Sequence, residues 1–143
     1  MSENPQESAQ PQSKPLEAEA MKPPKLLVVD DDRNMSALIC RLLEGYNYQI
    51  QVENDARNVM DRLREDSYSL VLVDLVMPYI GGLELVSLIK MEFNLPVIVM
   101  TGFASIQSAR KAMKAGADDF VTKPIEGEYW DMRIRRVLKP PRR

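Results

Sequence analysis

The chain alternates between short apolar runs and longer segments in which apolar residues recur at helical spacing. Three of the short runs are continuous and rich in Val and Ile, which is typical of strands covered on both faces. These runs are residues 25–30, 69–74 and 96–100. Residues 48–53 instead alternate between polar and apolar side chains, as a strand near a sheet edge does, and residues 118–123 form a shorter fifth candidate.

Each candidate strand is followed by a segment with the periodicity of an amphipathic helix. The apolar positions of these five segments are Met35, Leu38, Ile39, Leu42 and Leu43; Val59, Met60 and Leu63; Leu85, Val86, Leu88 and Ile89; Ile106, Ala109, Ala112 and Met113; and Trp130, Ile134, Val137 and Leu138. Gly116 is suited to end the fourth helix. Five strand–helix repeats predict a doubly wound α/β fold, in which right-handed crossovers place helices on both faces of a five-stranded parallel sheet.

The two ends of the chain differ in composition from this alternating part. Residues 1–24 are rich in Pro, Gln, Ser and Glu and have few apolar side chains, so we expect a disordered N-terminal extension. A single domain is expected over residues 25–138. Residues 139–143 are interpreted as a C-terminal tail or as the start of a linker.

Composition narrows the chemistry that the predicted domain can perform. The chain has no histidine and one cysteine, Cys40. This excludes a Ser-His-Asp or Cys-His catalyst, a zinc site built on imidazole, and a disulfide within the chain. Because the chain lacks both the roughly 18 consecutive apolar residues of a membrane span and the charge order of a signal peptide, we expect a cytoplasmic protein.

Charge gives little indication of a nucleic-acid partner. The formal net charge is −2, so the chain as a whole does not attract a polyanion. Arg133, Arg135 and Arg136 lie near the end of the last predicted helix, where basic side chains interact favourably with the helix dipole. We interpret them as a solvated helix face and do not expect direct nucleic-acid binding.

Polar side chains gather at the carboxyl ends of the predicted strands. The first strand ends in Asp30 and Asp31, the third in Asp74, the fourth in Thr101 and the fifth in Lys123. In the strand order 2-1-3-4-5 the first and third strands flank the point where the order reverses, which is where open α/β sheets bind ligands. Three carboxylates at that point repel one another, and a hard divalent cation such as Mg²⁺ would relieve the repulsion.

Four motifs, in this order and on these elements, resemble the receiver domain of bacterial two-component response regulators, the CheY-like superfamily. They are VVDDD at 28–32, LVDLVMP at 72–78 followed by Gly82, VMTG at 99–102, and DDFVTKP at 118–124. The resemblance covers residues 25–138 and implies a flavodoxin-like (βα)5 fold with strand order 2-1-3-4-5. It also implies a phosphoprotein of a phosphorelay, a signalling module and not an enzyme, whose phosphodonor is a sensor histidine kinase or a phosphotransfer protein.

Carried over position by position, the resemblance implies roles for the residues at the strand ends. Asp74 would be the phosphoacceptor and would pair with Lys123 before transfer. The implied ligands of Mg²⁺, for which Mn²⁺ can substitute, are Asp30, Asp31, Asp74 and the backbone carbonyl of Val76. The residues implied in binding the phosphoryl group and in the switch that follows are Thr101, Gly102, Lys123 and Phe120.

The resemblance also implies two local features and one surface. The peptide bond before Pro124 is implied to be cis, and Asp32 is expected to cap the helix after the first strand. Phosphorylation would change the surface over residues 104–138, which would act on an output partner or effector domain. The same surface could serve a homodimer.

Two apolar residues are predicted to control how long the phosphorylated state lasts. Val76 stands two residues after Asp74, and Phe103 stands two residues after Thr101. In a receiver these positions flank the path by which water reaches the acyl phosphate. Because both side chains are apolar and Phe103 is bulky, we expect them to keep water away and to prolong the phosphorylated state.

Two other functions stay open on the sequence. A haloacid-dehalogenase-type Mg²⁺ phosphohydrolase would use Asp30 as its nucleophile and Asp32 as its acid–base, but Arg33 follows where that motif normally continues with Thr or Val. A receiver-like module could instead bind its partner without using phosphorylation. Replacing Asp74 separates the receiver from the hydrolase, because only the receiver would lose its nucleophile.

Overall fold

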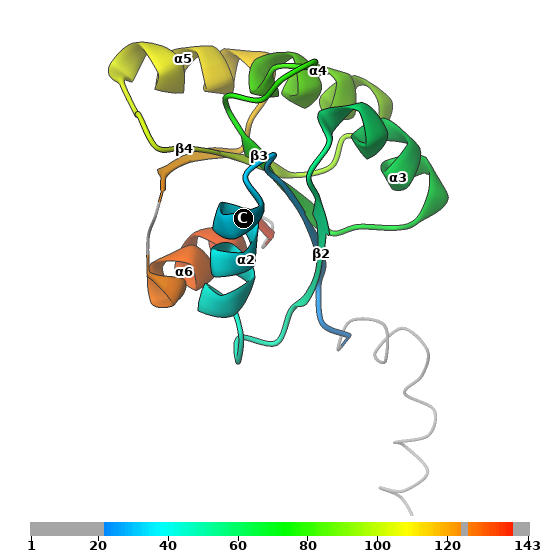
Figure 1. Cartoon of the computed structure of the whole chain (residues 1–143), viewed down its shortest axis with the longest axis vertical. Coiled ribbons are helices and arrows are strands. Elements are labelled where there is room, and N and C mark those ends of the chain that lie inside the picture. The colour runs from blue at the N-terminus through cyan, green and yellow to red at the C-terminus, as the bar shows by residue number, and fades with distance from the viewer. Residues whose placement is uncertain (1–21, 124–125, 139–143) are drawn as a thin grey trace, which may run out of the picture.

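A parallel β-sheet forms the middle layer of the fold, with helices on both of its faces (Figure 1). The structure is a computed structural model and describes residues 22–123 and 126–138. The predicted extension up to residue 21, Pro124 and the predicted tail at 139–143 lie outside the described residues.

The sheet has five strands in the order β2-β1-β3-β4-β5, as the sequence predicts. All four pairings are parallel. The strands are β1 Lys25–Val29, β2 Gln49–Glu53, β3 Leu70–Asp74, β4 Val97–Thr101 and β5 Asp119–Thr122. β3 and β4 are buried at every position, whereas β2 is partly exposed along its length. The prediction that residues 48–53 form an edge strand is therefore confirmed.

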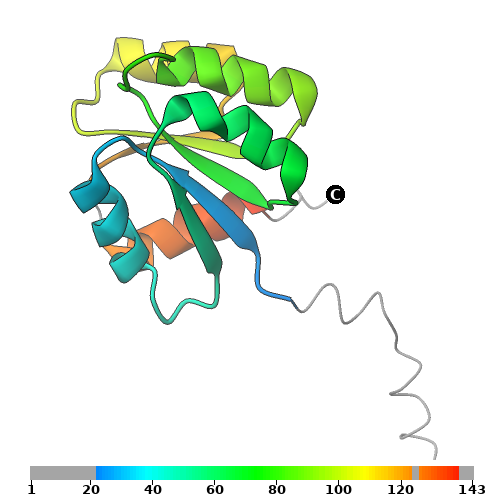
Figure 2. The same cartoon turned by 45° about the vertical axis from the view of Figure 1, so that its right-hand side comes forward.

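Each predicted helical segment forms a helix, and the helices divide between the two faces of the sheet. They are α2 Arg33–Leu42, the short 3₁₀ helix η1 Ala56–Asn58, α3 Val59–Glu65, α4 Gly82–Glu92, α5 Ile106–Ala115 and α6 Gly127–Leu138. α3, α4 and α5 lie on one face, and α2 and α6 lie on the other (Figures 1 and 2). Among the described residues, no helix has the length and apolar content needed to cross a bilayer.

Alternate residues along each strand supply two separate cores, one on each side of the sheet. Leu27 and Val29 pack with the apolar sides of α3, α4 and α5. Leu26 and Val28 point the other way and pack with α2 and α6, where Trp130 is fully buried. Because both faces are covered, the central strands are continuous apolar runs, and polar groups occur only where the strands end.

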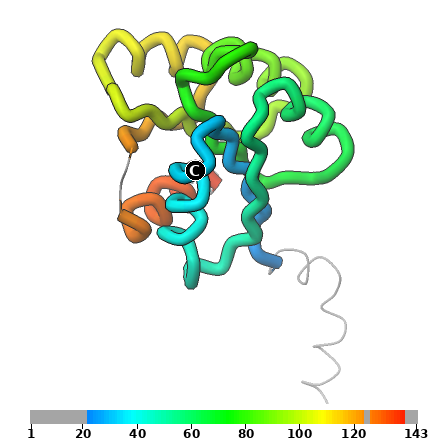
Figure 3. Tube along the Cα trace, in the orientation of Figure 1, coloured from blue at the N-terminus to red at the C-terminus, as the bar shows by residue number. Residues whose placement is uncertain are grey.

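Two helix ends are formed by the residues that the sequence predicts for them. Asp32 caps α2, because its Oδ1 accepts hydrogen bonds from the backbone nitrogens of Asn34 at 2.9 Å and Met35 at 3.1 Å. Gly116 ends α5 with a φ of 112°, in the left-handed region that glycine adopts readily. Both sequence predictions are confirmed. The trace in Figure 3 shows the turn after β1 at the centre of the carboxyl edge.

Candidate functional site

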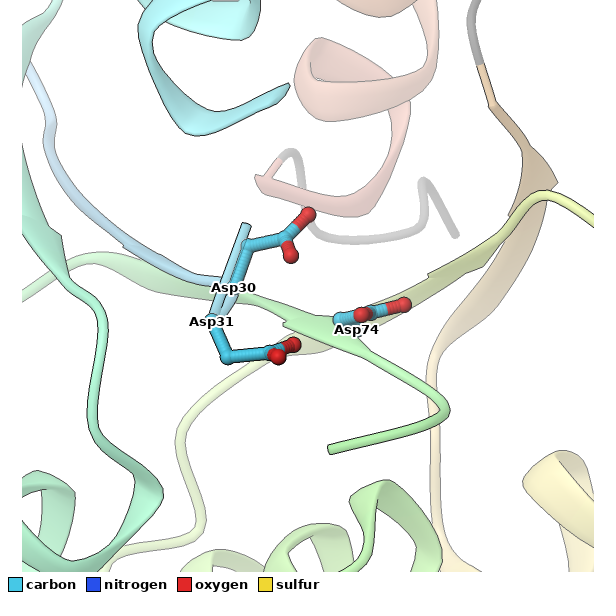
Figure 4. A group of neighbouring side chains, drawn as sticks. All are labelled: Asp30, Asp31 and Asp74. Carbon is cyan, nitrogen blue, oxygen red and sulfur yellow. The ribbon is translucent and has the colours of Figure 1, made fainter. Parts of the chain in front are cut away.

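The three carboxylates predicted at the strand ends meet at the carboxyl edge of the sheet. Asp30 and Asp31 follow β1, and Asp74 is the last residue of β3, the neighbour of β1. One carboxylate oxygen from each residue lies within 4.8 Å of the other two (Figure 4). We call Asp30, Asp31 and Asp74 the acidic cluster. The pairing of β1 with β3 therefore brings together side chains from two distant parts of the chain.

The acidic cluster is buried at one end and open at the other. Asp30 is 0% exposed and Asp74 is 6% exposed, whereas Asp31 is exposed. Both oxygens of Asp30 have partners, because Oδ1 accepts from the backbone nitrogen of Asp32 at 3.0 Å and Oδ2 accepts from Lys123 at 2.9 Å. Among the described residues, no hydrogen-bond donor or cation is paired with the Asp31 carboxylate. Asp31 is thus the carboxylate best placed to meet a ligand that arrives from solvent.

Lys123 places a positive charge beside the acidic cluster. Its ammonium nitrogen lies 2.9 Å from Asp30 Oδ2 and 3.3 Å from Asp74 Oδ1. The backbone nitrogen of Lys123 donates to the carbonyl oxygen of Thr101 at 2.7 Å, which extends the β4–β5 ladder and directs the end of β5 toward the site. The sequence predicts a pair between Lys123 and Asp74. The structure adds Asp30 as a second and closer partner.

The environment of Asp74 favours its protonated form. Burial and the nearby charge of Asp30 raise the pKa of Asp74 to about 6, although Lys123 and the backbone N–H of Val76 act in the opposite direction. Burial alone would lower the pKa of Lys123. The hydrogen bond to Asp30 and the charges of Asp30 and Asp74 outweigh that effect, and the pKa of Lys123 is raised. The three acidic side chains of the cluster thus have the one ammonium of Lys123 beside them.

This set of donors fits a hard divalent cation. Every side-chain ligand offered by the acidic cluster is an oxygen, and the oxygens converge within 4.8 Å of one another. The single ammonium of Lys123 leaves the cluster with an excess of negative charge in a largely buried position. Mg²⁺ binds to carboxylates of this kind and usually retains several waters. The exposed side of Asp31 leaves room for those waters.

Thr101 lies beside the acidic cluster at the end of β4 and is 2% exposed. Its Oγ1 accepts a hydrogen bond from the backbone nitrogen of Phe103 at 3.2 Å. The hydroxyl proton is therefore available for a second partner. A Cβ added at Gly102 would meet nothing within 4 Å, so the space beside this residue is open.

The other residues predicted to take part lie at different depths around the cluster. Val76 is 72% exposed and Phe103 is 90% exposed, so both side chains project from the loops after β3 and β4. Phe120 lies on β5 and is partly buried against the core below α3, α4 and α5.

Gly82 brings the start of α4 against the end of β3. A Cβ at Gly82 would lie 2.4 Å from the carbonyl oxygen of Asp74 and 2.7 Å from the Cα of Leu75. The backbone nitrogen of Gly82 also donates to the carbonyl oxygen of Leu75 at 3.0 Å. Only glycine fits this approach without moving the backbone that carries Asp74.

Three further residues, which follow β2 and β3, make contacts that the sequence analysis does not predict. Asn54, just after β2, hydrogen-bonds the backbone of Asp30. Tyr79 has a φ of 72°, and its exposed ring lies under the guanidinium of Arg57, whose carbon is 3.7 Å from the ring centroid. An amide side chain directly after a strand end could have indicated the first residue. The contact of Arg57 with Tyr79 joins two loops, and local periodicity carries no signal for it.

Comparison with known proteins identifies relatives over almost all of the described chain. The family model of the response regulator receiver domain matches residues 26–135. The response regulator ArlR of Staphylococcus saprophyticus is 32% identical over 115 residues, which are 80% of this chain and 52% of that protein. The transcriptional regulatory protein ZraR of Klebsiella oxytoca is 33% identical over 115 residues, 79% of this chain and 26% of that protein.

Solved structures show the same architecture. The receiver domain of the Francisella response regulator 1452 is similar with a TM-score of 0.74 and 28% identity, and the match covers 80% of this chain and 96% of that one. The BeF3-activated DrrB receiver domain is similar with the same TM-score and identity, over 82% of this chain and 99% of that one. The chain spans about half the length of ArlR and about a quarter of ZraR.

Proposed function

Because this chain belongs to the receiver domain family of two-component response regulators, we propose that it is a switch that accepts a phosphoryl group on Asp74. The receiver domain of response regulators is a signalling module. The observation that carries the proposal is the environment of the Asp74 side chain. Asp74 is buried, forms an ion pair with Lys123, and has a carboxylate oxygen within 4.8 Å of oxygens of two further carboxylates. In this proposal Asp74 attacks the phosphorus of the phosphodonor, an acyl phosphate forms, and the donor group leaves.

Positioning and charge neutralisation would supply most of the rate of this transfer. A carboxylate is a weak nucleophile, and phosphoryl transfer depends mainly on alignment of the two groups and on stabilisation of charge on the phosphoryl oxygens. Lys123 holds one oxygen of Asp74 and so restricts its rotation. Thr101 has a hydroxyl proton to donate to a phosphoryl oxygen, because among the described residues its Oγ1 accepts from the N–H of Phe103 and donates to no other group.

Mg²⁺ is the cofactor that we propose for this site, with Mn²⁺ as a substitute. Asp31 and Asp74 would hold the ion directly, Asp30 would hold it partly through water, and the backbone carbonyl of Val76 would complete the ligands. The occupied oxygens of Asp30 and the unpaired carboxylate of Asp31 support this division. When bound, the ion would supply positive charge close to the transferred phosphoryl group.

The proposed readout runs through Thr101 to β5. In this proposal Thr101 turns toward the phosphoryl group and Phe120 follows it, which changes the surface over residues 104–138. The phosphodonor would be a sensor histidine kinase or a phosphotransfer protein, since the chain itself has no histidine. An output domain or partner would then bind the changed surface. The names of the relatives ArlR and ZraR, a response regulator and a transcriptional regulatory protein, support a regulatory output.

The lifetime of the phosphorylated state is proposed to depend on Val76 and Phe103. Both side chains are apolar and largely exposed, on the loops that follow Asp74 and Thr101. We propose that they exclude water from the acyl phosphate once it forms.

One experiment separates this function from its two alternatives. The protein is incubated with Mg²⁺ and phosphoramidate, and both the covalent adduct and the phosphate released are measured for the wild type, Asp74→Asn and Asp30→Asn. A receiver forms an adduct that Asp74→Asn loses. A hydrolase of the haloacid-dehalogenase type keeps its turnover in Asp74→Asn and loses it in Asp30→Asn. A module that only binds gives neither adduct nor phosphate.

A further inference from the structure

Asn54 lies directly behind the turn that carries Asp30 and Asp31. It is the first residue after β2 and is partly buried. Its Nδ2 donates to the carbonyl oxygen of Asp30 at 2.7 Å and to Oγ of Ser36 at 3.1 Å. Its Oδ1 accepts from Arg33 Nη1 at 3.1 Å. The side chain therefore uses all of its polar groups within the segment between Asp30 and Ser36.

These bonds continue the pairing of β1 with β2 beyond the end of the two strands. The backbone register ends with Val29 opposite Glu53. The N–H of Asp30 still donates to the carbonyl oxygen of Glu53 at 3.2 Å, and the amide of Asn54 then binds the carbonyl of Asp30. Both backbone polar groups of Asp30 are satisfied by residues 53 and 54. Since Asp30 is fully buried, loss of either bond would leave a buried polar group without a partner.

The orientation of the Asn54 amide follows from the chemistry of its partners. A backbone carbonyl can only accept, so the atom 2.7 Å from the oxygen of Asp30 must be the nitrogen. A guanidinium can only donate, so the atom facing Arg33 must be the oxygen. Ser36 is 2% exposed and donates its own proton to the carbonyl of Arg33 at 3.1 Å, which leaves its oxygen to accept from Asn54. Of the neutral residues of this size, only asparagine meets all three requirements.

We propose that Asn54 is a positioning residue for the acidic cluster, acting through the backbone of Asp30. This inference rests on the proposed function, since it concerns the Mg²⁺ and phosphoryl chemistry of the same carboxylates. Asp31 has no partner of its own among the described residues. The backbone on either side of Asp31 therefore fixes the position from which its side chain extends, because Asn54 holds Asp30 and the Asp32 cap begins α2.

The test is the affinity for Mg²⁺ alone, measured by calorimetry on the whole chain. Asn54→Ala removes all three bonds, and Asn54→Leu removes them while keeping most of the volume. We expect either change to raise the dissociation constant for Mg²⁺ roughly tenfold, the usual effect of removing a group that holds a metal ligand. Asn58→Ala is the matched control. Asn58 also follows β2, and its side chain bonds only Glu53, at 3.3 Å, so this variant should keep the Mg²⁺ affinity of the wild type.

A second readout separates positioning from a general structural role. Urea denaturation in EDTA compares the metal-free stabilities of the same variants. If Asn54→Leu is destabilised but binds Mg²⁺ as the wild type does, Asn54 is only structural and the inference is overturned. Should Asn54→Ala fail to fold, Asn54→Ser keeps one donor and should show an affinity between those of Asn54→Leu and the wild type; an unchanged affinity would again overturn it. A wild type that binds no Mg²⁺ overturns the proposed cofactor together with this inference.

Discussion

Replacing the proposed phosphoacceptor Asp74 by asparagine should make the metal-free protein more stable. At neutral pH the buried carboxylate of Asp74 is ionised beside Asp30, and its environment raises its pKa to about 6. The difference from the ordinary pKa of an aspartate corresponds to about 3 kcal/mol that the folded state loses when Asp74 ionises. Because the cluster opens to solvent at Asp31, screening reduces this to roughly 1–2 kcal/mol. Asparagine has nearly the same shape and carries no charge, so it avoids this loss.

The effect depends on pH in a direction fixed by the raised pKa of Asp74. Well below pH 4 the side chain is protonated in both the folded and the unfolded state, so its ionisation costs the folded state nothing. As the pH rises from about 4 to 6, the unfolded state ionises first and the folded state is progressively destabilised. Above pH 6 the loss is complete. The advantage of Asp74→Asn should therefore be small near pH 4 and full at pH 7.5.

Urea denaturation in EDTA, at pH 4.5 and pH 7.5, measures this difference directly. Addition of Mg²⁺ at pH 7.5 is the control, because a ligand that binds the folded state stabilises it more the tighter it binds, with a logarithmic dependence on affinity. Mg²⁺ should stabilise the wild type more than Asp74→Asn and reduce or reverse the gap. If Asp74→Asn is less stable than the wild type in EDTA at pH 7.5, the charge repulsion inferred for the acidic cluster is wrong.

Four further changes test separate parts of the site. Gly82→Ala should lower the free energy of unfolding by about 2–3 kcal/mol, since its Cβ would lie 2.4 Å from a backbone oxygen. The control Gly81→Ala, whose Cβ meets nothing within 4 Å, should change the free energy by less than about 0.5 kcal/mol. Equal losses for the two variants in urea denaturation would contradict the prediction. Asp32→Ala should lower the free energy of unfolding by about 1 kcal/mol through the lost helix cap, and an unchanged free energy in urea denaturation would contradict the cap. If Mg²⁺ binds ionised Asp74, as proposed, its dissociation constant should rise up to roughly tenfold per pH unit below pH 6, whereas a flat calorimetric profile would exclude Asp74 as a ligand. Phe103→Glu should shorten the life of the adduct, followed by intact mass against time; an unchanged lifetime would refute the role of Phe103 in excluding water.

The fold and the meeting of the three carboxylates follow from the sequence because both depend on strand positions. Continuous apolar runs indicate buried parallel strands, and in a parallel sheet all strand ends of one kind share one edge. Observed strand boundaries differ from the predicted ones by one residue. β1 ends at Val29 because Asp30 already turns toward α2, and β4 extends to Thr101 because the backbone of Thr101 still pairs with β5.

The remainder of the site depends on side-chain direction, which periodicity does not encode. The position of Lys123 at the end of β5 predicts that its side chain reaches the acidic cluster. That its ammonium lies closer to Asp30, at 2.9 Å, than to Asp74, at 3.3 Å, is known only from the structure. The bonds of Asn54 join two connections that follow different strands, so no local pattern reveals them. The exposure of Phe103 depends on the path of the loop after β4 and is equally absent from the apolar pattern.

The most direct test of the central claim is the intact mass of the protein after incubation with Mg²⁺ and a small phosphodonor, followed by peptide mapping. The account predicts a gain of one phosphoryl group, roughly 80 Da, on the peptide that contains Asp74. The gain should be absent in EDTA and in Asp74→Asn. A gain of the same size in Asp74→Asn, or one located on the peptide containing Asp30, would contradict the assignment of Asp74 as the phosphoacceptor.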